Sequence, residues 1–192
     1  MRRGRFEQAR MVTIRKAMVS DAAAIAGVYV ETWRDTYAGI IPDRALVEMS
    51  RRRHATIWAQ DLGNGLKGQR VVVAEDALAG VVGFGSCGPA RGTDLPYEGE
   101  VYTLYVLPDF QGTGIGKRLL ARLFTILLEN GSDSALVWVL ADNPSRFFYQ
   151  TMGGAFAAVR KERLWGVTLP EMAYAWPDLK RAVAPSGPGS TP

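Results

Sequence analysis

The stretch QGTGIGK at residues 111–117 is the part of the chain whose residue types most clearly suggest chemistry. It stands between an apolar run that ends at Pro108 and a basic, leucine-rich run that is typical of a helix. The first N–H groups of a helix have no partner within the helix, and glycines let the backbone curl so that several of them converge. Because the helix dipole adds partial positive charge there, this segment suits an anion such as a diphosphate.

Two common phosphate-binding patterns fail on individual residues of this stretch. The P-loop pattern needs a glycine at the position of Gln111 and a magnesium-binding Ser or Thr at the position of Arg118. The dinucleotide pattern GxGxxG, started at Gly112, needs a glycine where Lys117 stands. The remaining pattern is Q-x-x-G-x-G from Gln111 to Gly116, which a tight strand-to-helix turn without a ligand would also satisfy.

Together with a second motif, this pattern resembles the GNAT superfamily of N-acyltransferases. The segment EVYTLYVLPDFQGTGIGKRLL, 100–120, matches that family's acetyl-CoA signature of strand, proline, Q/R-x-x-G-x-G/A and helix. The segment DNPSRFFYQTMGG, 142–154, matches its N-x-x-R-x-FY-x-x-x-G segment, and residues 14–37 look like its first strand and helix. The resemblance covers roughly residues 12–176 and is specific, because both motifs occur in the right order, separated by a helix and a strand. We therefore expect a GNAT N-acetyltransferase.

The resemblance implies an α/β fold of the α+β type, with a single mixed, mostly antiparallel, splayed sheet of about six to seven strands and about four flanking helices. Acetyl-CoA would be the co-substrate, without a metal, and its pantetheine arm would lie where the strand of Val106 splays from the strand at 135–140. The Val106 N–H would then stabilise the oxyanion of a tetrahedral intermediate. Asn143 also suits the N-cap of the next helix, and the two roles are compatible. The implied cofactor-binding residues are Leu104, Tyr105, Val106, Gln111, Gly112, Thr113, Gly114, Ile115, Gly116, Lys117 and Asn143.

Acetyl transfer to an amine needs proton movements that particular side chains can support. An alkyl ammonium, with a pKa of about 10, must lose a proton before it attacks, and the departing thiolate gains from receiving one. The resemblance places Tyr149 beside the CoA sulfur as the acid, with a core aromatic as the alternative. Glu100 is the candidate base, because even offsets along an extended strand would put it on the face of Leu104 and Val106. Glu98 is a fallback, and a solvated carboxylate with an ordered water as base remains open.

The acceptor site is expected between the first two helices and the loop near Tyr97, where Trp33 and Tyr37 would bind an amine-bearing acceptor. Core packing is the alternative for both, as it is for Trp58. His54, the only histidine, is expected on the surface and without a metal. Because no acidic cluster marks a polyamine acceptor, small amines, amino acids and protein amines all stay open. A non-catalytic acetyl-CoA-binding sensor or interaction module is the alternative function.

Composition and charge narrow the class of protein. The 192 residues, 47% apolar and 22% charged, fit one globular domain with short appendages, and no apolar run is long enough to span a membrane. The one cysteine, Cys87, excludes an internal disulfide, and the basic N-terminus lacks the apolar stretch of a secretory signal, so we expect a cytoplasmic protein. The net charge of +4 is mild, so neither nucleic acid nor a membrane is an expected partner, and the protein is expected to be a monomer or homodimer.

Hydrophobic periodicity and turn residues predict the elements that position these side chains. Strands are expected at 11–17, 69–76, 80–88, 100–108, 135–140, 155–165 and 168–176, and helices at 21–33, 43–49, 52–62, 117–130 and 143–152. A flexible basic arm at 1–10, the GNAT domain at 11–178 and a disordered tail at 179–192 complete the expected organisation.

Overall fold

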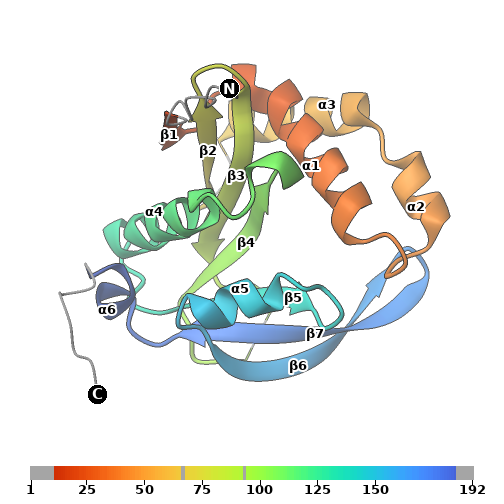
Figure 1. Cartoon of the computed structure of the whole chain (residues 1–192). Coiled ribbons are helices and arrows are strands. Elements are labelled where there is room, and N and C mark those ends of the chain that lie inside the picture. The colour runs from red at the N-terminus through yellow and green to blue at the C-terminus, as the bar shows by residue number, and fades with distance from the viewer. Residues whose placement is uncertain (1–10, 66–67, 93, 185–192) are drawn as a thin grey trace, which may run out of the picture.

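The computed structural model describes residues 11–65, 68–92 and 94–184, and one mixed sheet forms its centre (Figure 1). Seven strands lie in the order β1-β2-β3-β4-β5-β7-β6. Neighbouring strands are antiparallel except for β4 and β5, which are parallel. The mixed, mostly antiparallel sheet predicted from the sequence is therefore confirmed. The strands are Val12–Lys16 (β1), Arg70–Asp76 (β2), Gly80–Pro89 (β3), Gly99–Val106 (β4), Ala135–Leu140 (β5), Ala155–Leu164 (β6) and Val167–Trp176 (β7).

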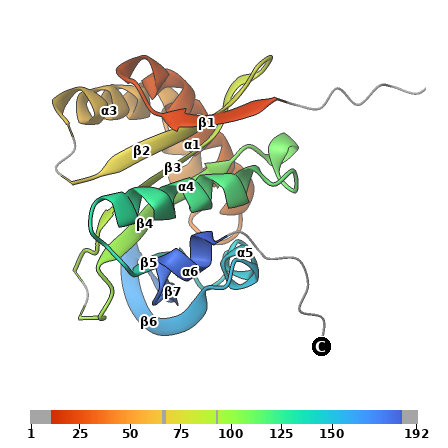
Figure 2. The ribbon, with the colours of Figure 1, turned by 90° about the vertical axis from the view of Figure 1, so that its left-hand side faces the viewer.

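Helices cover both faces of the sheet, with α4 on one face and α1 and α3 on the other (Figure 2). Alternate residues of β2 reflect these two layers. Val72 packs in the cluster that contains Leu119 of α4, whereas Val73 packs in the cluster that contains Ile25 of α1. The α-helices within the described residues are Ala22–Thr36 (α1), Asp43–Glu48 (α2), Arg51–Asn64 (α3), Ile115–Glu129 (α4), Arg146–Thr151 (α5) and Leu179–Val183 (α6).

The strands β4 and β5 pair only at their beginnings. Their parallel ladder joins Gly99–Val101 to Ala135–Val137 and stops there. Both strands continue beyond the ladder, β4 to Val106 and β5 to Leu140. Their second halves therefore face each other without ladder hydrogen bonds, which is the splayed arrangement that the sequence predicted.

A β-bulge interrupts the alternation of β4. Ser86 of β3 faces Thr103, but the next residue, Cys87, faces Val101, so Tyr102 is an extra residue on β4. A bulge of this kind shifts the side chains beyond it to the other face of the sheet. The alternation of side chains between the two faces of the sheet is therefore inverted between the residues before Tyr102 and those after it.

This bulge overturns one expectation about Glu100. Val101 packs in the α4 cluster together with Leu104 and Val106, although its odd number would place it on the opposite face of a regular strand. The prediction that Glu100 shares a face with Leu104 and Val106 is therefore wrong, because the bulge inverts the alternation between them.

The C-terminal boundary also differs from the prediction. A disordered tail was expected from residue 179, but Leu179–Val183 form α6, and the Asp178 carboxylate caps it by accepting the Arg181 N–H at 3.0 Å. Leu179 is fully buried in the cluster under α4. The sequence did not predict the short α6. The predicted arm at 1–10 and the remainder of the tail, 185–192, lie outside the described residues.

Candidate functional site

The glycine-rich segment forms a tight turn into α4. Gly112 and Gly114 have φ angles of 71° and 83°, a backbone conformation that residues with side chains adopt only with strain. Gly114 is the N-cap residue, and its carbonyl accepts the N–H of Arg118 at 3.1 Å. The N–H groups of residues 115–117 precede this first intrahelical bond and have no partner within the helix.

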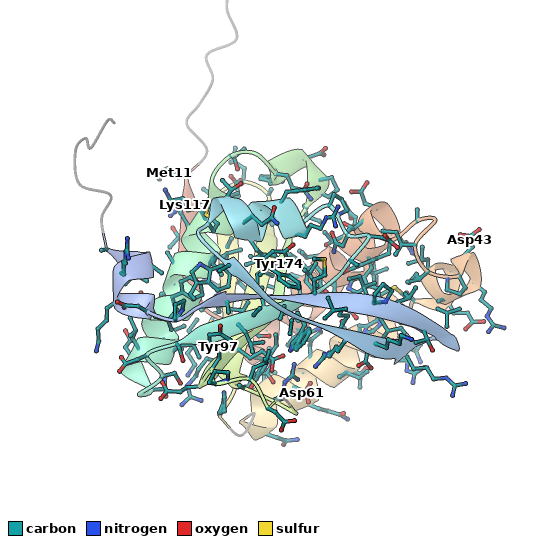
Figure 3. All side chains as sticks on the ribbon, turned by 90° about the horizontal axis from the view of Figure 1, so that it is seen from below. Met11, Asp43, Asp61, Tyr97, Lys117 and Tyr174 are labelled. Atoms are coloured by element: carbon teal, nitrogen blue, oxygen red, sulfur yellow. The ribbon has the colours of Figure 1, made fainter. Side chains whose placement is uncertain are left out.

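The first turn of α4 lies close to α5. A Cβ at Gly116 would lie 3.4 Å from two ring carbons of Phe148, so the glycine keeps the passage between the helices open. Lys117, labelled in Figure 3, lines the same passage and is its only charged lining residue within the described chain. Arg118 turns away and donates to the Val12 carbonyl oxygen at 2.7 Å. Lys117 is therefore the cation that this turn presents to a ligand.

A cavity of about 670 Å³ extends from this turn between α5 and the end of β4. We call it the glycine-loop cavity. Unpaired amides and Lys117 lie at one end, while Leu104, Val106 and Met152 supply apolar lining. This lining suits an elongated ligand with an anionic end and a largely apolar arm. Its lining residues are Leu104, Val106, Gln111, Gly112, Gly114, Gly116, Lys117, Pro144, Ser145, Phe148, Tyr149, Thr151 and Met152.

A second cavity, of about 300 Å³, lies between α1 and the diverging halves of β4 and β5. We call it the aromatic cavity. It is lined by Tyr29, Thr32, Trp33, Thr36, Tyr37, Tyr102, Thr103, Leu104, Tyr105, Val106, Gln111, Val137, Trp138, Val139, Leu140, Asn143, Ser145, Tyr149, Leu164 and Glu171. The two cavities share Leu104, Val106, Gln111, Ser145 and Tyr149, so two ligands could meet there.

Tyr149 of α5 stands at this junction. Its side chain is buried and packs edge-on against the rings of Phe148 and Trp176. Burial raises the pKa of the Tyr149 hydroxyl above its ordinary value, and the nearby Tyr37 adds to the effect. A hydroxyl in this environment stays protonated at neutral pH, so it can donate a proton but is a poor base.

The backbone of Val106 faces the gap between the strands. Leu107 donates its N–H to the Val82 carbonyl oxygen of β3 at 2.9 Å. Because the direction of backbone groups alternates along an antiparallel strand, Val106 directs its own N–H and C=O towards the opposite edge, where β5 does not pair. The Gln111 side chain donates to the Val106 carbonyl at 3.0 Å. The Val106 N–H is thus left as a donor directed into the gap.

Asn143 connects the start of α5 to the end of α1. Its Oδ1 accepts the Ser145 N–H at 2.8 Å, and its Nδ2 donates to the Tyr37 hydroxyl at 3.0 Å. Asn143 therefore stabilises the turn before α5, but the N-cap residue of α5 is Ser145, not Asn143 as the sequence suggested. Asn143 lines the aromatic cavity rather than the glycine-loop cavity.

The two predicted acceptor-binding residues, Trp33 and Tyr37, both line the aromatic cavity. Their ring centroids are 4.5 Å apart, and Tyr29 extends the group at 5.2 Å from Trp33. Trp58 lies elsewhere and packs against Phe84 at 5.3 Å between centroids. The aromatic wall thus comes mainly from α1.

Glu100, the predicted base, lines neither cavity. It stands at the paired beginning of β4, opposite Leu136. Its buried carboxylate accepts the backbone N–H of Arg91 and the Nη2 of the same residue, both at 2.9 Å. The structure therefore does not bring Glu100 together with Tyr149. The hydrogen bonds from Arg91 satisfy the buried Glu100 carboxylate.

Comparison with known proteins agrees with this architecture. The family described as Acetyltransferase (GNAT) domain matches residues 67–153. YuaI of Bacillus subtilis (strain 168), named an uncharacterized N-acetyltransferase, is 40% identical over 169 residues, which cover 88% of this chain and 95% of YuaI. The chain belongs to the GNAT acetyltransferase family.

Two further relatives illustrate this GNAT membership. The L-amino acid N-acyltransferase MnaT of Escherichia coli (strain K12) is 31% identical over 143 residues, covering 74% of this chain and 78% of MnaT. The structure of YncA from Salmonella typhimurium, solved with its cofactor acetyl-CoA, has a TM-score of 0.65 and 26% identity, and the match covers 92% of this chain and 99% of YncA. These values confirm the fold class predicted from the sequence.

Some residues of this GNAT protein lie away from the positions expected of them. Ile115 is buried in the core under α4, and the Thr113 hydroxyl donates to the Phe110 carbonyl oxygen at 2.6 Å. Neither residue lines the glycine-loop cavity or the aromatic cavity. His54, expected on the surface, is partly exposed on α3, where its ring packs at a tilt against Tyr29 at 4.8 Å between centroids. Its partial burial lowers the pKa of its imidazole.

Sequence reasoning about this GNAT chain missed Trp138, Phe148 and Glu171. Phe148 forms the α5 side of the passage at Gly116, and Trp138 forms part of the aromatic cavity. Glu171 is the only charged residue among the described lining of that cavity. A detectable signal existed, since Glu171 is the one carboxylate in the predicted strand at 168–176.

Two further observations bear on the class of protein. Within residues 11–65, 68–92 and 94–184, no helix combines the length and apolar character that crossing a membrane requires. The same residues contain no group of three or more His, Cys, Asp and Glu side chains placed to hold a metal ion.

Proposed function

We propose that the protein transfers an acetyl group from acetyl-CoA to a primary amine by direct attack within a ternary complex. The observation that carries this proposal is the junction of the two cavities at Leu104, Val106 and Tyr149. A thioester carbonyl delivered through one cavity and an amine held in the other would meet there without a covalent enzyme intermediate. YuaI and MnaT, which are named N-acetyltransferase and N-acyltransferase, support this assignment.

The diphosphate of acetyl-CoA is assigned to the start of α4. The free N–H groups of residues 115–117, the helix dipole and Lys117 all favour negative charge at this place. Gly116 leaves room for the ligand beside Phe148. The acetyl-CoA in the related YncA structure supports the same choice of ligand.

The pantetheine arm is assigned to the α5 side of the unpaired second half of β4, which the glycine-loop cavity reaches, and the acceptor to the α1 side of the same strand. Its amides can pair with strand backbone that has no ladder partner, as in strand addition. The Val106 N–H would then donate to the thioester oxygen as negative charge develops on it. Removing a donor of this kind typically costs about 10²- to 10³-fold in rate.

Tyr149 is assigned as the acid that protonates the departing CoA thiolate. It lies at the junction of the cavities, and burial keeps its hydroxyl protonated by raising its pKa. Proton donation of this kind contributes about 10²- to 10⁴-fold. Glu100 receives no role in proton transfer, since it lies outside both cavities and is held by Arg91.

The proposal is tested by measuring release of the CoA thiol from acetyl-CoA with a panel of primary amines, amino acids and peptides. Amine-dependent release is expected for part of the panel. If acetyl-CoA bound tightly but no acceptor released CoA, the protein would be an acetyl-CoA sensor rather than an enzyme.

A further inference from the structure

The aromatic cavity contains a carboxylate that has no assigned role, that of Glu171. This residue lies on β7, where Leu140 of β5 flanks it on one side and Arg160 of β6 on the other. Every other described residue that lines the cavity is uncharged at neutral pH, the tyrosines included. A cavity with aromatic walls and one carboxylate favours a cationic ligand with an apolar body.

The hydrogen bonds of Glu171 leave part of its carboxylate available to such a ligand. Its Oε2 accepts the Arg160 Nε at 2.8 Å, and its side chain is 13% exposed. Its Oε1 accepts no hydrogen bond from the described part of the chain. Arg160 is itself held over the ring of Trp138, at 4.1 Å from the ring centroid. The ion pair therefore fixes the carboxylate while one oxygen stays free.

The groups around Glu171 connect it to the reaction junction. Tyr37 at the end of α1 is close enough for the negative charge of Glu171 to add to the rise that burial causes in the Tyr37 pKa. Tyr37 in turn contributes to the raised pKa of Tyr149. The charged and titratable groups facing Glu171 are thus Arg160 from β6 and Tyr37 from α1, while β5 contributes the apolar Leu140.

We propose that Glu171 binds the ammonium group of the acceptor in the aromatic cavity and removes its proton. This inference rests on the proposed acetyl-transfer function and names the acceptor class, a compact primary amine with an apolar or aromatic body. The cavity volume of about 300 Å³ limits the acceptor to a compact molecule, and the aromatic walls of Trp33 and Tyr37 favour an acceptor with an apolar body.

Every proton and electron pair in this reaction has a defined destination. Glu171 takes one proton from the ammonium and passes it to solvent, and the freed nitrogen lone pair forms a bond to the thioester carbon. The carbonyl π electrons move to oxygen, beside the Val106 N–H, and return as the C–S bond breaks. Tyr149 gives its proton to the thiolate, and the phenolate regains a proton from the new amide nitrogen. The products are the acetylated amine, CoA thiol and one proton.

The test compares the wild-type protein with Glu171→Gln, which keeps the side-chain shape. The value of kcat/KM for 2-phenylethylamine and for L-leucine amide is measured with saturating acetyl-CoA from about pH 6 to about pH 10. We expect the variant to be at least about 100-fold slower near pH 7. As the pH rises, the difference in kcat/KM between the variant and the wild type should shrink by up to about tenfold per pH unit. The free amine, which needs no base, then becomes more abundant, whereas the wild type also uses the ammonium form.

Two control variants separate this role from a structural one. Arg160→Met loosens the Glu171 carboxylate but keeps it, so its loss of activity should be clearly smaller than that of Glu171→Gln, at most about tenfold. Glu129→Gln removes an exposed carboxylate paired with Arg122 on α4, and should change nothing. Calorimetric titration should show that each variant binds acetyl-CoA as the wild type does, which checks that the fold is intact.

Three results would overturn the inference while leaving acetyl transfer in place. These are a loss in Glu171→Gln of less than about threefold, a loss that stays constant with pH, or an equal loss in Arg160→Met. Absence of turnover by the wild type with every amine would instead overturn the proposed function itself, and the inference with it.

Discussion

The side-chain amide of Gln111 donates a 3.0 Å hydrogen bond to the carbonyl oxygen of Val106. This bond ties the glycine-rich turn to the last residue of β4, at the place where that strand has lost its neighbour on one side. It leaves the Val106 N–H as the directed donor in the gap. The first residue of the Q-x-x-G-x-G pattern thus positions the strand end, while the glycines form the turn itself.

Removing this bond should slow catalysis more than it weakens cofactor binding. In Gln111→Leu, the Val106 peptide loses a hydrogen bond whose net worth is about 1 kcal/mol, which corresponds to a decrease of about fivefold in kcat. The Kd for acetyl-CoA should change by less than about twofold, because the amides of α4 are untouched. Steady-state kinetics and calorimetry measure the two values. A large rise in Kd with unchanged kcat would mean that Gln111 binds the cofactor directly.

Gly116→Val should selectively impair acetyl-CoA binding. Even the first carbon of the new side chain would lie 3.4 Å from Phe148, so the larger valine would close the passage beside the free amides. We expect the Kd for acetyl-CoA, measured by calorimetry, to rise at least about tenfold, or about 1.4 kcal/mol. Gly27→Ala is the matched control, because a Cβ at Gly27 on α1 meets no atom within 4 Å. Unimpaired binding by Gly116→Val would place the diphosphate elsewhere.

Tyr149→Phe should abolish most of the turnover while the protein stays folded. The variant loses the proton donor at the junction, so kcat should fall by about 10²- to 10⁴-fold near pH 7. Because burial raises the Tyr149 pKa above its ordinary value of about 10, the hydroxyl stays protonated and the wild type should lose no acid function below about pH 10. A pH–rate profile measures this. An unchanged rate in the variant would assign the proton to another group.

Glu100→Gln should affect stability rather than chemistry. The buried carboxylate accepts hydrogen bonds from Arg91, and weakening such charged bonds costs about 1–3 kcal/mol in the free energy of unfolding. Thermal or urea denaturation would detect this loss. The rate of CoA release by the folded fraction should stay within about threefold of wild type. A drop of about 100-fold in that rate, with stability unchanged, would restore Glu100 as the base.

The sequence predicted the parts of the site that are encoded within short segments. The glycine turn, the helix after it and the segment around Tyr149 each depend on neighbouring residues, and the structure places Gly114 and Tyr149 on the same cavity. The bulge at Tyr102 could not be predicted, because it arises from pairing with a different strand. Glu100 was consequently assigned to the wrong face.

The place of Glu171 in the aromatic cavity also could not be predicted from the sequence. Its place in the aromatic cavity depends on α1, β5 and β6 meeting around β7, and these segments are far apart in the chain. The sequence shows only that Glu171 is the one charged residue in the predicted strand at 168–176. The α6 helix was missed for a simpler reason, since five residues give too short a pattern for helical periodicity to be recognised.

The central claim is that acetyl-CoA and an amine react at the junction beside Tyr149. The most direct test incubates the purified protein with acetyl-CoA and a compact primary amine and quantifies both products, CoA thiol and acetylated amine, by mass spectrometry. The account predicts equal amounts of the two products, with neither formed when the amine is omitted. Bound acetyl-CoA that yields neither product with any primary amine would contradict it.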